Sequence, residues 1–264
     1  MHMQKRPEEK KYPQGSAYLY CVTRGEGSLA AGIRGIEAGE IKRVRAGDLS
    51  AFVQEPSFMQ GLPDKALLEE WIVIHHRTIE AVILGFGAAL PFGFGKVLAG
   101  EDGKSPDEFL LGWLAANYED LKEKLDRVEG RDEYGVQVFW DAQAVAQMVS
   151  SGPEIKKMVD EVAWCSEGTA YLQGERLKRA VQHAMAELAG SYFAEIYRGL
   201  GPYSDRIKVE QVKKAAEGRQ MIVNVSCLVR RESADALGEY LGKVETERGA
   251  QVRFTGPWPP YSFV

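Results

Sequence analysis

Residues 221–229 read MIVNVSCLV, an apolar run rich in β-branched residues that is typical of a strand buried in a sheet. A second strand-like segment, residues 207–213, precedes it across a glycine-containing turn. Ser233 begins a helix, and a final strand is predicted over residues 251–255. A strand over residues 134–140 and the helical segments after it complete the order strand, helix, strand, strand, helix, strand. This order predicts a ferredoxin-like domain, in which helices cover one face of an antiparallel sheet.

The chain before residues 207–213 contains more helix than this arrangement needs. Residues 142–162 predict helical segments broken at Gly152-Pro153, and residues 174–197 predict one long helix. The C-terminal domain is therefore expected to be ferredoxin-like with extra helices.

The first half of the chain predicts three strands, a helix, a strand and a further helix. From Asp64 to Phe86, apolar residues recur at three- and four-residue intervals, as in a helix that buries one face. The second helix opens at Ser105 and continues its apolar stripe to Leu125. The predicted strands are residues 17–23, 41–45, 49–54 and 90–98.

Together these patterns predict an α+β fold of two domains, each an antiparallel sheet with helices packed on one face. We expect the domains to cover residues 17–130 and 131–255. Residues 1–16 are expected to form a flexible tail, and residues 256–264 an aromatic and proline-rich tail docked on the domains.

The composition is that of a soluble globular protein, with 45% hydrophobic and 27% charged residues in 264. A formal net charge of −5 argues against nucleic acid as a partner, because phosphate binding needs an accumulated basic surface. Apolar runs stay short of the roughly 20 residues that cross a bilayer, and the first dozen residues are charged. We therefore expect a cytoplasmic protein without a membrane partner.

The search for catalytic and metal-binding motifs is negative. Cys21, Cys165 and Cys227 lie far apart, without the spacing of a zinc site or a disulfide framework. His75 shares the apolar face of its helix, where a hydrogen-bonded core histidine is favoured over a catalytic base, and the adjacent His76 is expected to be exposed. We predict no enzyme, no catalytic residue, no cofactor and no metal.

The chain ends in three aromatic residues interleaved with prolines, at Trp258, Tyr261 and Phe263. Proline restricts the backbone, so this tail loses little entropy when its rings dock. Two roles remain open. The rings can pack on the domains as structure, which we favour, or they can form a hot spot for a partner chain.

Three segments resemble the GvpL/GvpF family of gas vesicle proteins: YLYCV at residues 18–22, the segment LPFGFG at residues 90–95, and the end GPWPPYSF at residues 256–263. Pro91, Phe94 and Gly95 match the family's Leu-Pro-x-x-Phe-Gly motif. Gly93 and Lys96 depart from the family pattern, which has arginine and often threonine there.

The resemblance implies an accessory or minor structural protein of the gas vesicle. Such a protein would bind the small, very hydrophobic major shell protein, support gas vesicle assembly and contact other gas vesicle accessory proteins. It would be cytoplasmic and associated with the gas vesicle.

Two other classes of function remain as alternatives. A small-molecule sensor or enzyme on ferredoxin-like domains would need a deep polar pocket around His75 or His183. An RNA-binding module would need exposed aromatic residues on a sheet, for which Tyr18 and Tyr20 are candidates.

Overall fold

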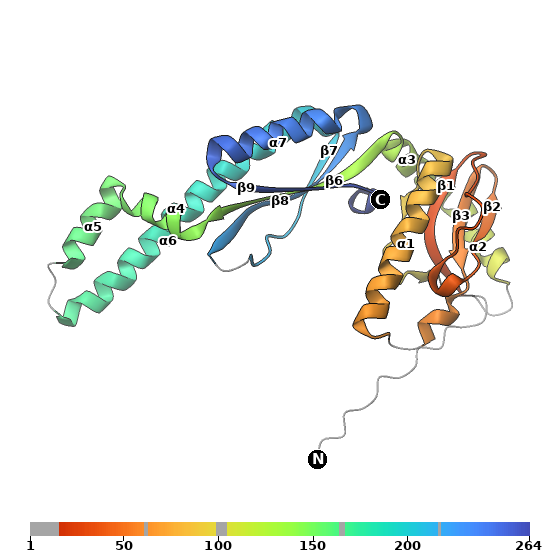
Figure 1. Ribbon diagram of the computed structural model, residues 1–264, viewed down its shortest axis with the longest axis horizontal. Coiled ribbons are helices and arrows are strands. Elements are labelled where there is room, and N and C mark those ends of the chain that lie inside the picture. The colour runs from red at the N-terminus through yellow and green to blue at the C-terminus, as the bar shows by residue number, and fades with distance from the viewer. Residues whose placement is uncertain (1–15, 61–62, 99–104, 164–166, 216–217) are drawn as a thin grey trace, which may run out of the picture. The chain divides into compact units, whose positions relative to one another are not determined.

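The computed structural model of the chain describes residues 16–60, 63–98, 105–163, 167–215 and 218–264 (Figure 1). The predicted flexible tail before Ser16, and Cys165, lie outside the described residues. The chain folds into two compact units. The first consists of Met1–Asp132 with Trp258–Val264, and the second consists of Glu133–Pro257.

The first unit is built on a five-stranded antiparallel sheet. Its strands are β1 (Ala17–Arg24), β2 (Lys42–Ala46), β3 (Leu49–Gln54), β4 (Leu90–Pro91) and β5 (Val97–Leu98). They lie in the order β2-β3-β1-β4, and β5 also pairs with β1. Each described pairing in this sheet is antiparallel.

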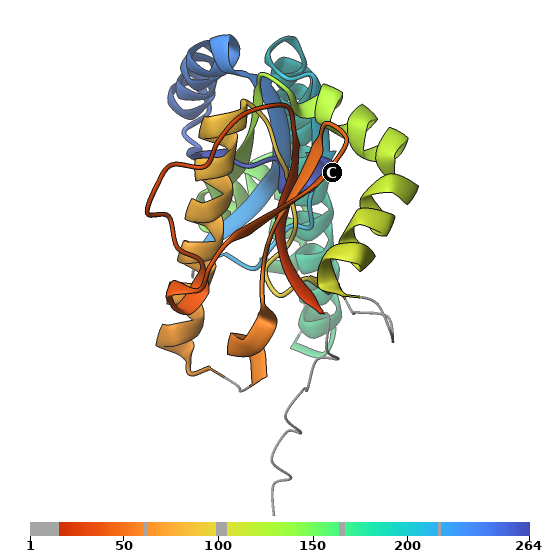
Figure 2. The ribbon, with the colours of Figure 1, turned by 90° about the vertical axis from the view of Figure 1, so that its right-hand side faces the viewer.

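Helices cover both faces of this sheet (Figure 2). The long helix α1 (Lys65–Phe86) packs on one face, while α2 (Pro106–Ala116) and α3 (Tyr118–Val128) pack on the other. The prediction of helices on one face is wrong for this unit. The physical reason is that β1 is buried on both sides, so each side needs apolar cover.

A β-bulge in β1, between Leu19 and Cys21, changes which side chains face α1. Tyr18, Tyr20 and Cys21 all belong to the core beneath α1, whereas Leu19 and Val22 belong to the core beneath α2 and α3. The extra residue of a bulge disturbs strict alternation, and here it places two tyrosines and a cysteine on the α1 side.

Two predicted elements of this unit are interrupted. The predicted strand over residues 90–98 is split into β4 and β5, because residues 92–96 turn out of the sheet. The predicted second helix is divided at Asn117, whose φ of −109° and ψ of 14° depart from helical values. Short 3-10 turns lie at Ile36–Ala38 and Pro56–Gln60.

The second unit contains a four-stranded sheet in the order β7-β8-β6-β9. Its strands are β6 (Arg131–Asp141), β7 (Arg206–Val209), β8 (Arg219–Arg230) and β9 (Gln251–Trp258). The strand order, with helices between β6 and β7 and between β8 and β9, is compatible with the ferredoxin-like arrangement.

The helices of this unit are α4 (Ala142–Ser150), α5 (Pro153–Ala163), α6 (Glu167–Leu200) and α7 (Ala234–Arg248). Alternate residues of β6 and β8 form one core with the last turns of α6 and with α7, as the side-chain alternation of a half-buried sheet requires. Turns of 3-10 type lie at Gly201–Tyr203, Arg231–Ser233 and Tyr261–Phe263. Among the described residues, no helix is both long enough and apolar enough to cross a membrane.

Several elements have bounds that differ from expectation. β7 ends at Val209 rather than at residue 213, and beyond the strand the side-chain amide of Asn224 donates to the carbonyl of Gln211. α6 extends to both sides of the predicted helix. β9 continues through Gly256 and Pro257 to Trp258, so the tail begins as a strand.

Candidate functional site

The segment that carries the family-like motif forms a loop out of the first sheet. β4 pairs with β1 at Cys21–Val22, and β5 pairs with it at Ala17–Tyr18, so residues 92–96 leave the sheet opposite Leu19–Tyr20. The loop is tied to β1 at both ends. The Phe92 N–H donates to the Tyr20 carbonyl at 2.9 Å, and the Leu19 N–H donates to the Lys96 carbonyl at 3.0 Å.

Two residues shape this loop. Pro91 lies in β4, buried against Cys21, and fixes the backbone just before the chain leaves the sheet. Gly95 has a φ of +85°, a conformation that side chains with a Cβ rarely adopt. Gly93, by contrast, would meet nothing within 4 Å if it carried a Cβ. Of these two glycines, Gly95 is therefore the one that the backbone conformation requires.

His75 on α1 connects this loop to β1. Its Nε2 lies 2.9 Å from the Phe92 carbonyl oxygen and its Nδ1 lies 2.7 Å from the Tyr18 hydroxyl. Because a carbonyl can only accept, Nε2 carries the proton, and Nδ1 accepts the hydrogen bond of Tyr18. Both ring nitrogens are thus used by the fold.

Burial keeps this histidine neutral. It is 2% exposed, and removal from water lowers its pKa to about 4, against a smaller opposing effect of the Phe92 carbonyl. Burial also raises the pKa of Tyr18 and raises that of Tyr20 to about 12. These groups are held in their neutral forms near pH 7, which suits a structural hydrogen-bond chain.

Aromatic rings enclose the histidine. Tyr20 stacks on His75 with ring centroids 5.3 Å apart, and Phe94 of the loop meets the same ring edge-on at 5.8 Å. Phe94 also contacts Tyr18, and Tyr18 contacts Phe58. Aromatic pairs of this geometry are worth roughly 0.5 to 1.5 kcal/mol each beyond the burial of their surface.

The C-terminal tail contacts the neighbouring side of α1. The ring centroid of His76 lies 5.1 Å from that of Trp258, in an edge-to-face contact, and 6.2 Å from that of Tyr261, in a stacked contact. Its Nε2 is also 3.2 Å from a carboxylate oxygen of Glu80. The expectation that His76 is exposed is therefore wrong, because residues far away in sequence cover its ring.

The tail itself is folded into a 3-10 turn. The Tyr261 N–H donates to the Pro259 carbonyl at 2.7 Å, and the Phe263 N–H donates to the Pro260 carbonyl at 3.2 Å. Pro259, Pro260 and Phe263 are buried, whereas Trp258 is 43% exposed. The same tail thus offers a buried anchor and a partly accessible ring.

The motif loop and the C-terminal tail both contact α1. Adjacent residues on a helix point about 100° apart, so His75 faces the sheet and the motif loop while His76 faces the tail. The spacing of apolar residues predicts that His75 lies on the buried face of α1, but it links neither histidine to the motif or to the tail. No local signal could have done so, since the contacts of His76 join residues 76 and 258.

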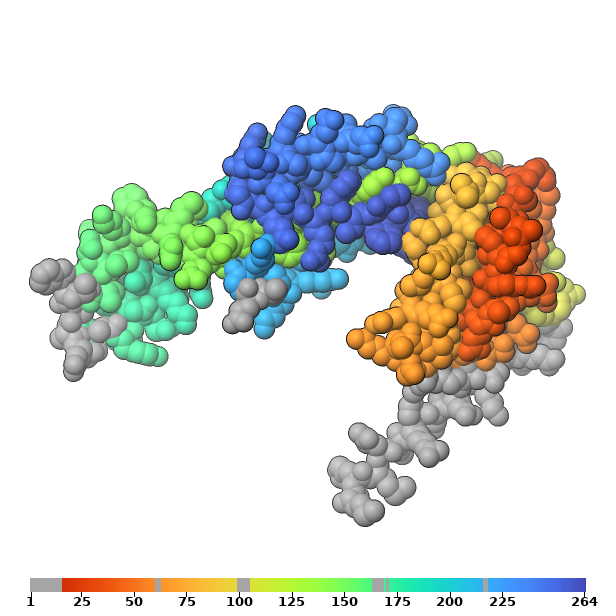
Figure 3. Space-filling model, viewed as in Figure 1, coloured from red at the N-terminus to blue at the C-terminus, as the bar shows by residue number. Residues whose placement is uncertain are grey.

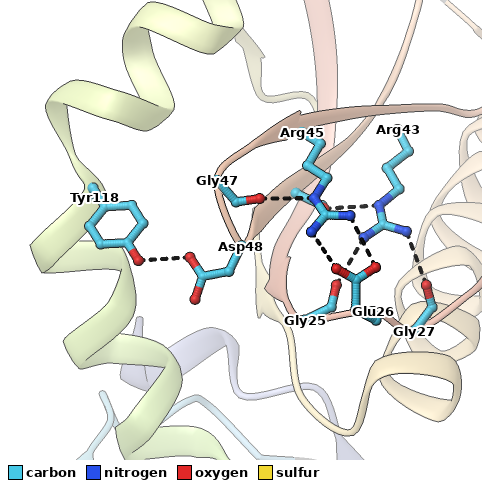
Figure 4. Close-up of polar contacts among 9 residues, drawn as sticks. Gly25, Glu26, Gly27, Arg43, Arg45, Gly47, Asp48 and Tyr118 are labelled. Atoms are coloured by element: carbon cyan, nitrogen blue, oxygen red, sulfur yellow. Dashed lines mark hydrogen bonds and ion pairs between the residues drawn. The ribbon is translucent and has the colours of Figure 1, made fainter.

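Two arginines of the edge strand β2 form a network of polar contacts (Figure 4). The Nε of Arg43 donates to the Ser50 hydroxyl at 2.9 Å, and its terminal nitrogens donate to the carbonyls of Gly25 and Gly27 at 2.9 and 3.0 Å. Its guanidinium also lies 4.8 Å above the Phe86 ring. Arg43 therefore fastens the loop after β1 to the sheet.

Arg45 extends this network on the same side of β2 (Figure 4). Its Nε donates to the Gly47 carbonyl at 2.8 Å, and its terminal nitrogens contact both carboxylate oxygens of Glu26. Nearby, the Tyr118 hydroxyl donates to Asp48 at 2.7 Å. Since these guanidinium groups bind partners within the unit, the cluster is better described as a clamp than as an anion site.

The alternatives that depended on specific side chains gain no support. Tyr18 and Tyr20 are fully buried, so they cannot stack on RNA bases. His75 is enclosed and His183 lies on α6 with 75% of its side chain exposed. A hollow of about 610 Å³ in the first unit contains neither histidine; it is lined by Ala46, Gly47, Ala115, Ala116, Asn117, Tyr118, Glu119 and Asp120.

Comparison with known proteins agrees with the motif resemblance. Residues 16–264 match the family model described as gas vesicle synthesis protein GvpL/GvpF. Gas vesicle protein L1 of Halobacterium salinarum is 23% identical over 264 residues, covering 97% of this chain and 92% of that protein. Gas vesicle protein L of a Streptomyces species is 27% identical over 258 residues, covering 93% of this chain and 91% of that protein.

Two crystal structures share the fold. GvpF from Anabaena sp. PCC7120 superposes with a TM-score of 0.77 at 19% identity, covering 94% of this chain and 97% of that chain. GvpF from Microcystis aeruginosa superposes with a TM-score of 0.69 at 17% identity, covering 95% of this chain and 99% of that chain. At such identities the likeness concerns the fold, whereas the family match spans the described chain. The chain therefore belongs to the GvpL/GvpF family of gas vesicle synthesis proteins and has a role in gas vesicle formation.

Proposed function

We propose that this protein is an accessory or minor structural component of the gas vesicle that binds the major shell protein and supports assembly. The observation that carries the proposal is the family match over residues 16–264, which includes both units and the tail. A function carried by one domain alone would require similarity to the family only over that domain.

The physical task suits the side chains described above. A very apolar shell protein must be kept from self-association until it is placed, and this needs an apolar surface or a sheet edge rather than a reactive group. The buried His75 and its neutral tyrosines serve the fold, and the arginines of β2 are held within the unit. None of these groups is presented to a substrate.

We also propose that the tail is mainly structural. Phe263 is 8% exposed and packs with the two prolines before it out of solvent. Trp258, with 43% of its surface exposed, is the aromatic residue of the tail most accessible to a partner.

The proposal is tested by co-expressing the full chain, carrying an affinity tag, with the untagged major shell protein. We expect the shell protein to be retained with the tagged chain and to be recovered in the soluble fraction. As a control, an unrelated tagged α+β protein of similar size should retain none. Retention no greater than this control, with both proteins expressed, would refute the binding proposal.

A further inference from the structure

α1 carries apolar side chains that its own unit leaves partly exposed. Leu68, Ile72 and Val73 are 37%, 44% and 47% exposed. Leu68 and Ile72 lie one helical turn apart, and Val73 lies beside Ile72 toward the outer side of the helix. We refer to these three residues as the α1 row. In Figure 3 α1, coloured orange, forms part of the open surface of the first unit.

The tail already uses the next turn of this row for apolar contact. His76 follows Ile72 at the i+4 position, and Trp258 and Tyr261 pack on its ring. Trp258 remains 43% exposed at the end of this contact. The α1 row therefore lies one helical turn from the residue that the tail contacts, so a partner helix of two or more turns along α1 can reach both the row and the tail.

The backbone of α1 decides which kind of segment can bind. A strand gains affinity by pairing with free backbone groups at a sheet edge, but the backbone of a helix interior is already hydrogen-bonded within the helix. A partner on the α1 row must therefore satisfy its own backbone, as a helix does. Residues four apart form a ridge that packs into the groove of a second helix.

Charge indicates the flanks of this partner helix. The exposed charged residues of α1 and its N-cap are predominantly acidic: Asp64, Glu69, Glu70 and Glu80 against Lys65 and Arg77. Glu69 and Glu70 lie within the turn that joins Leu68 to Ile72. A helix with lysine or arginine beside its apolar face would match this rim, whereas an acidic one would be repelled.

We propose that the α1 row and the exposed part of Trp258 bind an amphipathic helix whose apolar face is flanked by basic residues. This inference rests on the proposed function, since the helix is assigned to the major shell protein. It adds the face that binds and the chemistry that is recognised.

The test compares shell-protein retention by the tagged full chain and its variants after co-expression. The double variant Ile72→Arg/Val73→Arg places two positive charges where a basic-flanked apolar helix would sit. Leu84→Arg is the matched control, because Leu84 is 89% exposed on the same helix, about 16 Å from Val73. Thermal melting of each variant checks that the fold is intact.

We expect the double variant to retain at least tenfold less shell protein than the wild-type chain, while Leu84→Arg retains a wild-type amount. A second variant, Glu69→Lys/Glu70→Lys, should also weaken retention but leave the apolar row in place. Wild-type retention by the double variant would overturn this surface and leave the proposed function standing. Absence of retention by the wild-type chain would overturn the proposed function itself. Equal loss in Leu84→Arg would also overturn the assignment, because the effect would not be specific to the row.

Discussion

Truncation of Phe263 should destabilise the first unit, although this residue lies next to the last of the chain. The Phe263→Ala variant removes a ring that is 8% exposed. Burying a phenylalanine ring takes roughly 150 to 250 Å² out of water, which corresponds to about 4 to 6 kcal/mol at about 25 cal/mol per Å². Because the unfolded chain already buries some apolar surface, this value is an upper bound.

The residues around Phe263 can also shift to fill part of the space that a missing ring leaves. We therefore expect the low end of the range measured for Phe→Ala in protein cores, about 3 kcal/mol. For a unit of this size, such a loss lowers Tm by about 6 to 12 °C. Because the tail belongs to the first unit, the unfolding transition of that unit should shift to lower temperature.

Differential scanning calorimetry is the suitable assay, because two units can unfold in separate transitions that a single spectroscopic probe would merge. Val264→Ala is the matched control, since Val264 is 39% exposed and its truncation should change stability by less than about 0.5 kcal/mol. Deletion of residues 259–264 removes no residue of β9 and should destabilise at least as much as Phe263→Ala. A Tm shift for Phe263→Ala no larger than that of the control would refute the claim that the tail is a structural anchor.

The remaining predictions concern the motif loop and its supports. Burial lowers the folded-state pKa of His75 from 6.5 to about 4, so the unfolded state binds more protons between these values. Stability should then fall by up to about 3 kcal/mol as the pH drops through this window; urea unfolding near neutral and near acidic pH should show this loss, and His75→Gln should lack it. Gly95→Ala should lose about 1 kcal/mol or more in urea unfolding, because φ is +85°, whereas Gly93→Arg should be tolerated. Arg43→Lys should make the Gly25–Gly27 loop more sensitive to limited proteolysis, because one ammonium group cannot replace donors to three separate acceptors; an unchanged cleavage rate would contradict the clamp.

Local patterns predicted the regular elements well where one physical requirement dominated. The three- and four-residue spacing of apolar residues indicated α1, and the β-branched run at residues 221–229 indicated β8. Ser105 caps α2 with the reciprocal hydrogen bonds to Glu108 that its sequence position suggests.

The same patterns failed where a contact with a distant segment decided the local structure. Residues 90–98 read as one strand, yet Phe92 and Lys96 bond to the adjacent β1 residues Tyr20 and Leu19, so the residues between them have no position on β1 to pair with. Helices on both faces of the first sheet were missed because the period of a strand does not reveal which elements will cover it.

The sequence by itself determined most of the segments that become helix or strand and, through its motifs, the family. These depend on interactions between residues close in the chain, or on residue identities that can be read directly. Only the tertiary structure decided that His75 holds the motif loop and that His76 lies beneath the tail. Such contacts join residues far apart in sequence, and they form only when burial of apolar surface outweighs the entropy lost in bringing those segments together.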